Sequence, residues 1–176
     1  YGMENTERMD RIFRKRVHRA DYVAEYQRVY DANKVLFKGQ PAVPFTFKDI
    51  TGKKVSLSDL KGKYVYIDVW ATWCGPCNAE IPHLKKLEEE FEGRNIYFVS
   101  ISCADSRNAW ERFVQVKQLG GIQLHMGGDK SFMEAIRCKG IPRFMLIDQD
   151  GKFLNANMPR PSDGKTLEIL NALPGL

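Results

Sequence analysis

The chain has 176 residues, 43% of them hydrophobic, which suits one globular domain with an added terminal segment. Its 27 basic and 22 acidic residues give a formal net charge of +5, and their mixing along the chain argues against a nucleic-acid groove. No apolar run approaches the length of a membrane span, so we expect no direct membrane insertion by this chain. The start at Tyr1 suggests that an export signal, an anchor or an upstream domain has been removed.

Residues 1–38 are predicted to form a helical arm. Apolar side chains between residues 8 and 33 recur at helical spacing, which predicts one helix there. The basic cluster in RIFRKRVHRA is interpreted as a solvated helix face rather than a site for an anionic partner. The segment KGQPAVP, from Lys38 to Pro44, ends the helix and leads into the main domain, residues 39–176. The sequence assigns no activity to the arm.

The main domain alternates between strands and helices. FTFKDITGKKVSL is predicted to form two short strands around a turn, and YVYIDVW is apolar on both sides, as in a strand covered on both faces. A helix follows from Cys74 to about Glu92, then a buried strand at NIYFVSIS and a helix at SRNAWERFVQVKQLG that ends on glycine. The series ends with a short strand at IQLHM, a short helix at KSFMEAIRC, a hairpin of RFMLID with KFLNA, and a final helix at SDGKTLEILNAL. The pattern predicts an α/β fold.

The motif WCGPC carries the chemistry. Cys74 lies where a strand gives way to a helix, so its sulfur is expected among backbone N–H groups that favour a thiolate. Cys77 lies one turn deeper on the same face, close enough for a disulfide but less exposed. Gly75 and Pro76 allow a tight turn into the helix. The pattern predicts that Cys74 attacks a substrate disulfide and that Cys77 resolves the mixed disulfide.

A structural zinc site is the main alternative for a C-x-x-C pair. Such a site needs four ligands, and the remaining candidates, Cys103, Cys138, His83 and His125, form no second closely spaced pair. We therefore predict no metal. Cys103 and Cys138 are expected to be free and partly buried, although a bridge between them would be the one further disulfide possible if Cys74 pairs with Cys77.

These residues resemble the active-site region of the thioredoxin superfamily, and the stretch from Gly39 to Phe91 is similar to bacterial exported thiol-disulfide oxidoreductases of the TlpA/ResA type. The similarity reaches the C-terminus and includes SLSDLKGK, Pro82 and Ile141-Pro142. It implies a thioredoxin-like fold with a central mixed sheet flanked by helices and an N-terminal β-hairpin. The long interval between Cys74 and Pro142 implies an extra helix-strand insertion.

The resemblance also implies roles for single residues. Cys74 would be the nucleophile, Cys77 the resolving thiol, Asp68 the buried acid, and Pro142 a cis-proline facing the pair. The cis bond comes from the resemblance alone, because most X-Pro bonds are trans. With that bond cis, the backbone of Ile141 could pair with an extended substrate segment. The expected substrate-binding residues are Trp73, Gly75, Pro76, Ile141 and Pro142.

Asp68 lies within the apolar strand that precedes the cysteines. Burial should raise the pKa of its carboxyl group, so that it can accept a proton near neutral pH. It could then take the proton of Cys77 directly or through one water. A buried Asp68 that is only satisfied by hydrogen bonds is the structural alternative. Trp70 shares its strand face and is interpreted as a core residue.

The sequence thus predicts a thiol-disulfide oxidoreductase that needs no metal or organic cofactor. Gly75-Pro76 resembles reducing members of the family, so we expect a reductase of exported protein disulfides, in the periplasm or anchored facing it. Cytochrome c maturation and a membrane electron donor are further expectations of the resemblance. Two alternatives stay open. One is a thiol peroxidase of the peroxiredoxin type, whose nucleophile motif carries a proline that ATWC lacks; the other is a binding module with incidental thiols.

Overall fold

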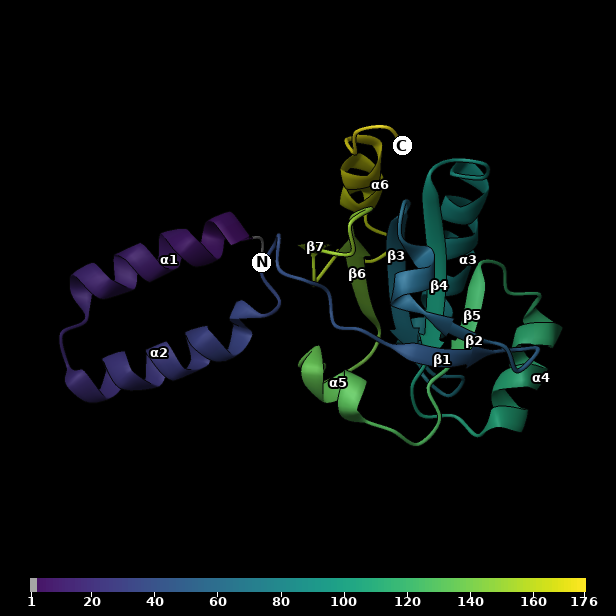
Figure 1. The fold of residues 1–176 in the computed structure, drawn as a ribbon, viewed down its shortest axis with the longest axis horizontal. Helices are drawn as coiled ribbons and strands as arrows, with labels where there is room; N and C mark the ends of the chain where they lie inside the picture. Colours follow the sequence, from purple (N-terminus) through teal and green to yellow (C-terminus); the bar gives the residue numbers. More distant parts are fainter. Residues whose placement is uncertain (1–2) are drawn as a thin grey trace.

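The main domain is built on one mixed sheet of seven strands, in the order β2-β1-β5-β4-β3-β6-β7 (Figure 1). The computed structural model describes the backbone of residues 3–176 and the side chains from residue 8 onward. The strands are β1 (Thr46–Asp49), β2 (Lys54–Ser56), β3 (Tyr64–Trp70), β4 (Ile96–Ser102), β5 (Ile122–His125), β6 (Arg143–Ile147) and β7 (Phe153–Asn155). The helices are α1 (Met3–Arg16), α2 (Ala20–Lys34), α3 (Gly75–Glu90), α4 (Arg107–Lys117), α5 (Ser131–Ala135) and α6 (Gly164–Asn171), with a 3₁₀ turn, η1 (Leu57–Leu60).

Strand β3 lies inside this sheet and is buried along its whole length. It runs parallel to β4 and antiparallel to β6, and β4 in turn runs parallel to β5. Alternation along β3 places Val65, Ile67 and Val69 in one core cluster, which includes Phe132 of α5. The opposite face carries Tyr66 and meets α3 and α6. The covered sheet and the thioredoxin-like fold that the sequence predicted are confirmed.

The leading hairpin and the insertion are also present. β1 pairs antiparallel with β2 and with β5, so the hairpin extends the sheet at one edge. α4 and β5 form the extra helix-strand unit after β4. One detail of the prediction is wrong: α4 does not end on glycine. Its last turn is closed by Gln118, which adopts a left-handed conformation with φ of 48°, while the N–H of Leu119 donates to the carbonyl of Val114.

The N-terminal arm is not the single helix that the apolar spacing of residues 8–33 predicted. It folds into two helices, α1 and α2, that lie side by side and project from the domain (Figure 1). Phe13 stacks on Tyr26 at 4.0 Å between ring centroids, and Arg14 donates to the side chain of Gln27 at 2.6 Å. The fold-back has a physical reason, because the apolar stripe that gives a helix its periodicity can be covered by a second helix. Periodicity alone does not locate the bend.

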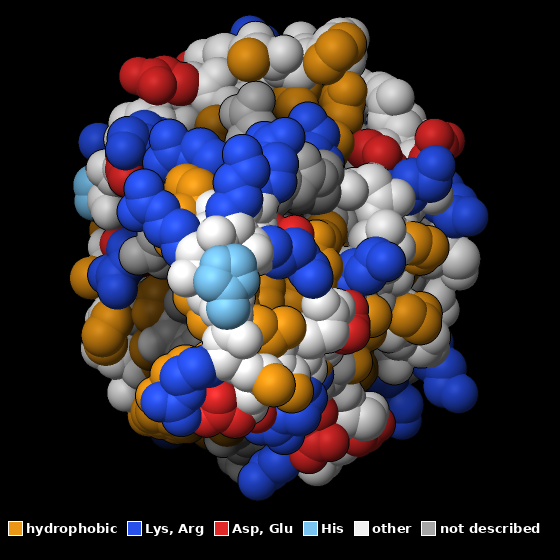
Figure 2. Space-filling view, turned by 90° about the vertical axis from the view of Figure 1, so that its left-hand side faces the viewer, with side chains coloured by type: hydrophobic (Ala, Val, Ile, Leu, Met, Phe, Trp, Pro, Cys, Tyr) orange, Lys and Arg blue, Asp and Glu red, His pale blue; other side chains and the backbone are white. Residues whose placement is uncertain are grey.

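The exposed face of the arm is rich in positive charge. Figure 2 views the molecule from this side and shows lysine and arginine side chains gathered there. The exposed basic residues around the bend are Arg11, Arg14, Lys15, Arg16 and Arg19. Two of them are paired within the arm, Arg14 with Asp10 and Arg19 with Asp21.

The root of the arm is fixed to the far edge of the sheet. The N–H of Gly39 donates to the carbonyl of Phe153, and the N–H of Phe153 donates to the carbonyl of Gln40. Ala42 donates to Gly151 in the same ladder. The segment after α2 therefore caps β7, at the opposite edge of the sheet from the β1–β2 hairpin. Among the described residues, no helix is long and apolar enough to cross a bilayer.

Candidate active site

Cys74 and Cys77 lie at the junction between β3 and α3 and are joined by a disulfide. Cys74 is the N-cap of α3, and the backbone N–H of Cys77 donates to its sulfur at 3.2 Å. Gly75 and Pro76 form the first turn, where a missing N–H costs nothing. The sulfur of Cys74 therefore occupies the position where unpaired helix N–H groups stabilise negative charge.

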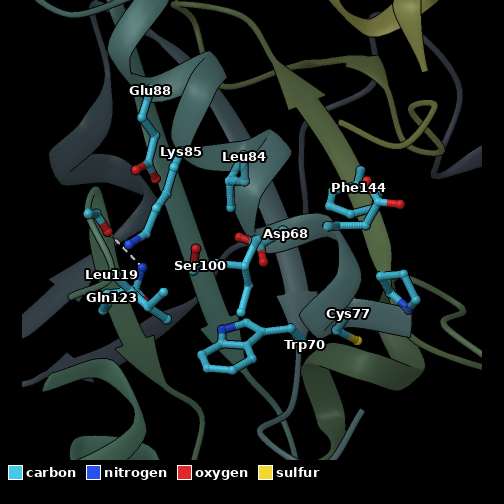
Figure 3. A pocket seen from close by; sticks show the side chains of 14 residues that line it. Asp68, Trp70, Cys77, Leu84, Lys85, Glu88, Ser100, Leu119, Gln123 and Phe144 are labelled. Atoms are coloured by element: carbon cyan, nitrogen blue, oxygen red, sulfur yellow. Dashed lines mark hydrogen bonds between the residues drawn. The ribbon is translucent and has the colours of Figure 1, made fainter. Parts of the chain in front are cut away.

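The two cysteines are equally exposed but have different surroundings. Each residue is 4% exposed, so the prediction that Cys77 would be the less exposed of the two is wrong. Both pack in one cluster with Trp70 and with Trp110 of α4, which covers this end of the sheet. Cys77, however, also lines an internal cavity that extends toward Asp68 (Figure 3).

An exposed rim surrounds the buried pair. Trp73 is 66% exposed, and its ring N–H reaches the carbonyl of Ala104 at 3.4 Å. Gly75 and Pro76 are exposed, whereas Ile141 and Pro142 are half-buried. The Ile141-Pro142 peptide bond is cis, as the resemblance implied, and Pro142 lines the same cavity as Cys77. The structure thus brings the predicted substrate-binding residues to the disulfide, and their roles remain predictions.

Asp68 projects from β3 into the cavity between Trp70 and Leu84 (Figure 3). Burial raises the pKa of its carboxyl group to about 7. The polar side chain of Ser100, its neighbour on β4, opposes this shift, and the charge of Glu88 adds to it. The raised pKa agrees with the expectation from the sequence, and the role of Asp68 as a proton acceptor stays a prediction.

The cavity itself is small and partly polar. Its free volume is about 20 Å³, which is room for about one water molecule. Asp68, Cys77 and Pro142 line one part, and Lys85 and Glu88 of α3 line another. Cys77 and Asp68 thus line one cavity that has room for about one water molecule.

Asp105 is a site residue that sequence reasoning missed. Its carboxylate, in the loop after β4, accepts hydrogen bonds from the backbone N–H of Thr72 at 3.0 Å and from the hydroxyl groups of Thr72 and Ser102, each at 2.6 Å. Asn78 of α3 donates to the carbonyl of Thr72 from the other side. These contacts fix the loop that carries Trp73 and Cys74. A signal was available, because Asp105 follows a strand parallel to β3, and such strands end at the same edge of the sheet.

Two glutamates of α3 were also missed. Glu80 is buried and accepts hydrogen bonds from the backbone N–H and the hydroxyl of Ser162, both at 2.9 Å, with Arg160 at 3.7 Å. Glu88 is half-buried at the cavity, and burial raises its pKa to about 7. Helical spacing from Cys77 would have placed Glu80, Leu84 and Glu88 on the helix face toward the sheet.

Cys103 and Cys138 are both free and half-buried, as predicted. They line a shared surface pocket away from the disulfide. Burial is the main cause that raises the pKa of Cys103 to about 11, and the neighbouring Cys138 is the second. The thiol of Cys103 therefore stays protonated near neutral pH. Among the side chains of residues 8–176, no group of three or more His, Cys, Asp and Glu is placed to hold a metal ion.

Comparison with known proteins agrees with this geometry. The sequence profile of the AhpC/TSA family matches residues 38–155. The thiol-disulfide oxidoreductase ResA of Bacillus subtilis is 30% identical over 152 residues, which cover 85% of this chain and 84% of that protein.

Two solved structures from Bacteroides vulgatus, both described as candidate thiol-disulfide oxidoreductases, share the fold. A solution structure has 60% identity and a TM-score of 0.69, covering 76% of this chain and 88% of that chain. A crystal structure has 37% identity and a TM-score of 0.74, covering 78% of this chain and 97% of that chain. The disulfide at the start of α3, the fold and these relatives agree: the chain belongs to the AhpC/TSA family and, within it, to the thiol-disulfide oxidoreductases of the ResA type.

Proposed function

We propose that this oxidoreductase is a reductase of protein disulfides, in which Cys74 attacks and Cys77 resolves. The observation that carries the proposal is the unequal setting of the pair. Cys74 caps α3 and accepts the N–H of Cys77, whereas Cys77 alone of the two lines the cavity that holds Asp68. This difference supports a thiolate at Cys74 and a proton transfer from Cys77 to Asp68.

In the first half of the reaction, the thiolate of Cys74 attacks one sulfur of a substrate disulfide. A Cys74–substrate disulfide forms, and the second substrate sulfur leaves as a thiolate that takes up a proton. The N–H of Cys77 and the other unpaired N–H groups at the start of α3 stabilise the attacking sulfur. The exposed rim of Trp73, Gly75 and Pro76, with the backbone at Ile141, is proposed to hold the substrate chain.

In the second half, Asp68 accepts the proton of Cys77, and the Cys77 thiolate attacks the sulfur of Cys74. The Cys74–Cys77 disulfide forms, and the substrate leaves as its second thiol after protonation. Two electrons have passed from the protein to the substrate. A carboxyl group with a pKa of about 7 is matched to this transfer, because it is partly ionised at neutral pH and still a useful base.

We propose further that the substrates are exported proteins and that a membrane electron donor reduces the disulfide again, in or facing the periplasm. Support comes from the resemblance to exported oxidoreductases and from the Gly-Pro pair between the cysteines. A role in cytochrome c maturation belongs to the same proposal. The basic residues of the arm (Figure 2) are not among those that form the disulfide or line the cavity, and no activity is assigned to them.

Equilibration in glutathione redox buffers, followed by tryptophan fluorescence, tests the direction of electron flow. We expect a potential nearer the roughly −270 mV of thioredoxin than the roughly −120 mV of a strong oxidant such as DsbA. A value more oxidising than about −180 mV would exclude a reductase. The same preparation, given hydrogen peroxide and a reductant, should consume little peroxide, whereas rapid turnover would favour the peroxidase alternative.

A further inference from the structure

Glu88 has no part in the reaction described above, yet it reaches the cavity that Asp68 and Cys77 line. It lies on α3, and Figure 3 shows its carboxyl group beside Lys85, at the far end from Cys77. It is half-buried, whereas Asp68 is only 8% exposed. Glu88 is therefore the carboxyl group of this cavity that is nearer to solvent.

The backbone opposite Glu88 is shaped to accept its carboxyl group. A Cβ atom at Gly120 would lie 2.5 Å from Oε2 of Glu88, and one at Gly121 would lie 2.9 Å from Oε1. A side chain at Gly120 would displace the carboxylate, and one at Gly121 would collide with the backbone carbonyl of Phe98, at 2.8 Å, as well as with Glu88. Gly121 also has a φ of +62°, which side chains rarely allow. The loop after α4 thus brings its bare backbone against Glu88.

The charged neighbours of Glu88 on α3 act on its pKa in opposite directions. Lys85, one turn away on α3, lowers the pKa of Glu88, but its ammonium group donates to the carbonyl of Lys117 at 2.7 Å. Glu89 on the same helix acts in the opposite direction. The loop after α4 and β5 contribute the uncharged Gly120 and Gln123, and the amide of Gln123 donates to the carbonyl of Gly120 at 2.7 Å. The charged partner across the cavity is Asp68 of β3, with Glu80 of α3 also in the lining.

Two further polar atoms belong to side chains that line this cavity. Within the described part of the chain, the ring nitrogen of Trp70 and the side-chain oxygen of Gln123 are buried and have no hydrogen-bond partner. Both side chains line the cavity. A free donor and a free acceptor beside a volume large enough for one water molecule can hold that water by hydrogen bonds. A hydrogen-bonded water can carry a proton along the cavity, which a dry apolar cavity cannot do.

We propose that Glu88 is a positioning residue that acts through Asp68: the two carboxyl groups share one proton across the cavity, and Glu88 is the member that exchanges it with solvent. This inference rests on the proposed function. Two carboxylates on one low-dielectric cavity repel each other, so ionisation of one makes the other a stronger base. After Asp68 has taken the proton of Cys77, that proton leaves through the Glu88 end, and Asp68 is again ionised for the next turnover.

The shared proton predicts a particular change in the pH dependence. Glu88→Gln removes the like charge, so Asp68 should become ionised at lower pH and be a weaker base. That charge is present only where Glu88 is ionised, above its pKa of about 7, so near pH 5.5 the two proteins should release substrate at nearly the same rate. If the acid dissociation constant of Asp68 rises tenfold in the variant, a Brønsted dependence of about one half makes release about threefold slower near pH 8.5. The two profiles should therefore coincide at low pH and separate above about pH 7, whereas loss of folded protein would lower the rate at every pH.

The experiment uses reduced protein and excess oxidised glutathione as the probe, so that resolution of the glutathione adduct limits the rate. Glu90→Gln serves as the control, since Glu90 is exposed on the same helix and the charge change is the same. It should keep the wild-type profile. The double variant Asp68→Asn/Glu88→Gln should match Asp68→Asn alone, because Glu88 acts through Asp68. Carboxyl ¹³C chemical shifts should show Asp68 titrating at lower pH in Glu88→Gln.

Coincident profiles for wild type and Glu88→Gln, or an equal change of profile in Glu90→Gln, would overturn the inference. Both outcomes differ from failure of the proposed function, in which the wild-type protein would form no glutathione adduct on Cys74. Normal adduct formation with an unchanged profile would therefore reject the role of Glu88 alone.

Discussion

Cys77 donates its backbone N–H to the sulfur of Cys74, and the same residue lines the cavity that Asp68 enters. One residue thus takes part in both halves of the proposed reaction. Its backbone stabilises the attacking thiolate, and its thiol later gives a proton to the buried acid. The two halves are expected to respond to different substitutions, because the first depends on the start of α3 and the second on β3.

Asp68→Asn should slow the release step and leave the first attack nearly unchanged. The amide keeps the shape of the side chain but cannot accept the Cys77 proton at neutral pH. We expect release at pH 7 to be roughly tenfold to a hundredfold slower, with partial recovery at higher pH as Cys77 ionises without help. Stopped-flow measurement of adduct formation and adduct decay separates the steps. An unchanged decay rate would leave Asp68 with a structural role only.

The same substitution should remove a pH dependence of stability. Because the pKa of Asp68 is raised to about 7, the folded protein keeps this proton between pH 4 and 7 while the unfolded chain has lost it. Stability of the oxidised protein therefore falls as pH rises through this window, by at most about 4 kcal/mol from Asp68. Glu88, also raised, contributes in the same direction.

In Asp68→Asn, the free energy of unfolding should fall less as pH rises than it does in wild type. The variant should therefore be more stable than wild type at pH 8 and lose that advantage at pH 4, provided that the amide finds hydrogen-bond partners. Urea unfolding of the oxidised proteins at a series of pH values measures it. A constant difference between the two proteins across pH 4–8 would contradict the raised pKa.

Asp105→Ala should lower the stability of the fold and slow the first attack by Cys74. It removes the acceptor for Thr72 and Ser102 and so frees the loop before Cys74. We expect a loss of about 2 kcal/mol in unfolding free energy and slower adduct formation. Asp163→Ala is the matched control, because it removes the N-cap of α6, away from the disulfide. That variant should be destabilised but should attack at the normal rate; equal slowing in both would show that Asp105 acts only through global stability.

Cys103 and Cys138 should react slowly and unequally with alkylating reagents in the oxidised protein. At pH 8, a thiol with a pKa of about 11 is ionised to about one part in a thousand, so Cys138 should be modified first. Mass spectrometry of a timed series of unreduced samples follows both. Absence of any alkylation would reveal a bridge between them, and faster modification of Cys103 would contradict its raised pKa.

The parts of the site that sequence predicted are those whose chemistry is local. Cys74, Cys77 and the start of α3 follow from one short motif, and the buried Asp68 follows from a polar residue in an apolar strand. The cis bond before Pro142 came only with the family resemblance, since no local pattern specifies it.

The missed residues depend on contacts between elements that are distant in sequence. Asp105 is 33 residues from Thr72, and Glu80 is 82 residues from Ser162. Glu88 becomes notable only because the Gly120-Gly121 turn packs against it. The bend in the arm was missed for a related reason, because helical spacing is the same for one long helix and for two helices that pack together.

Covalent trapping tests the central claim most directly, because it reports which sulfur carries the substrate. Reduced Cys77→Ser and Cys74→Ser proteins are mixed with a disulfide-containing protein, quenched with acid and analysed by mass spectrometry. The proposed reaction predicts that Cys77→Ser accumulates an adduct on Cys74, since the resolving thiol is gone, and that Cys74→Ser accumulates none. Equal trapping by the two variants, or an adduct only on Cys77, would contradict it.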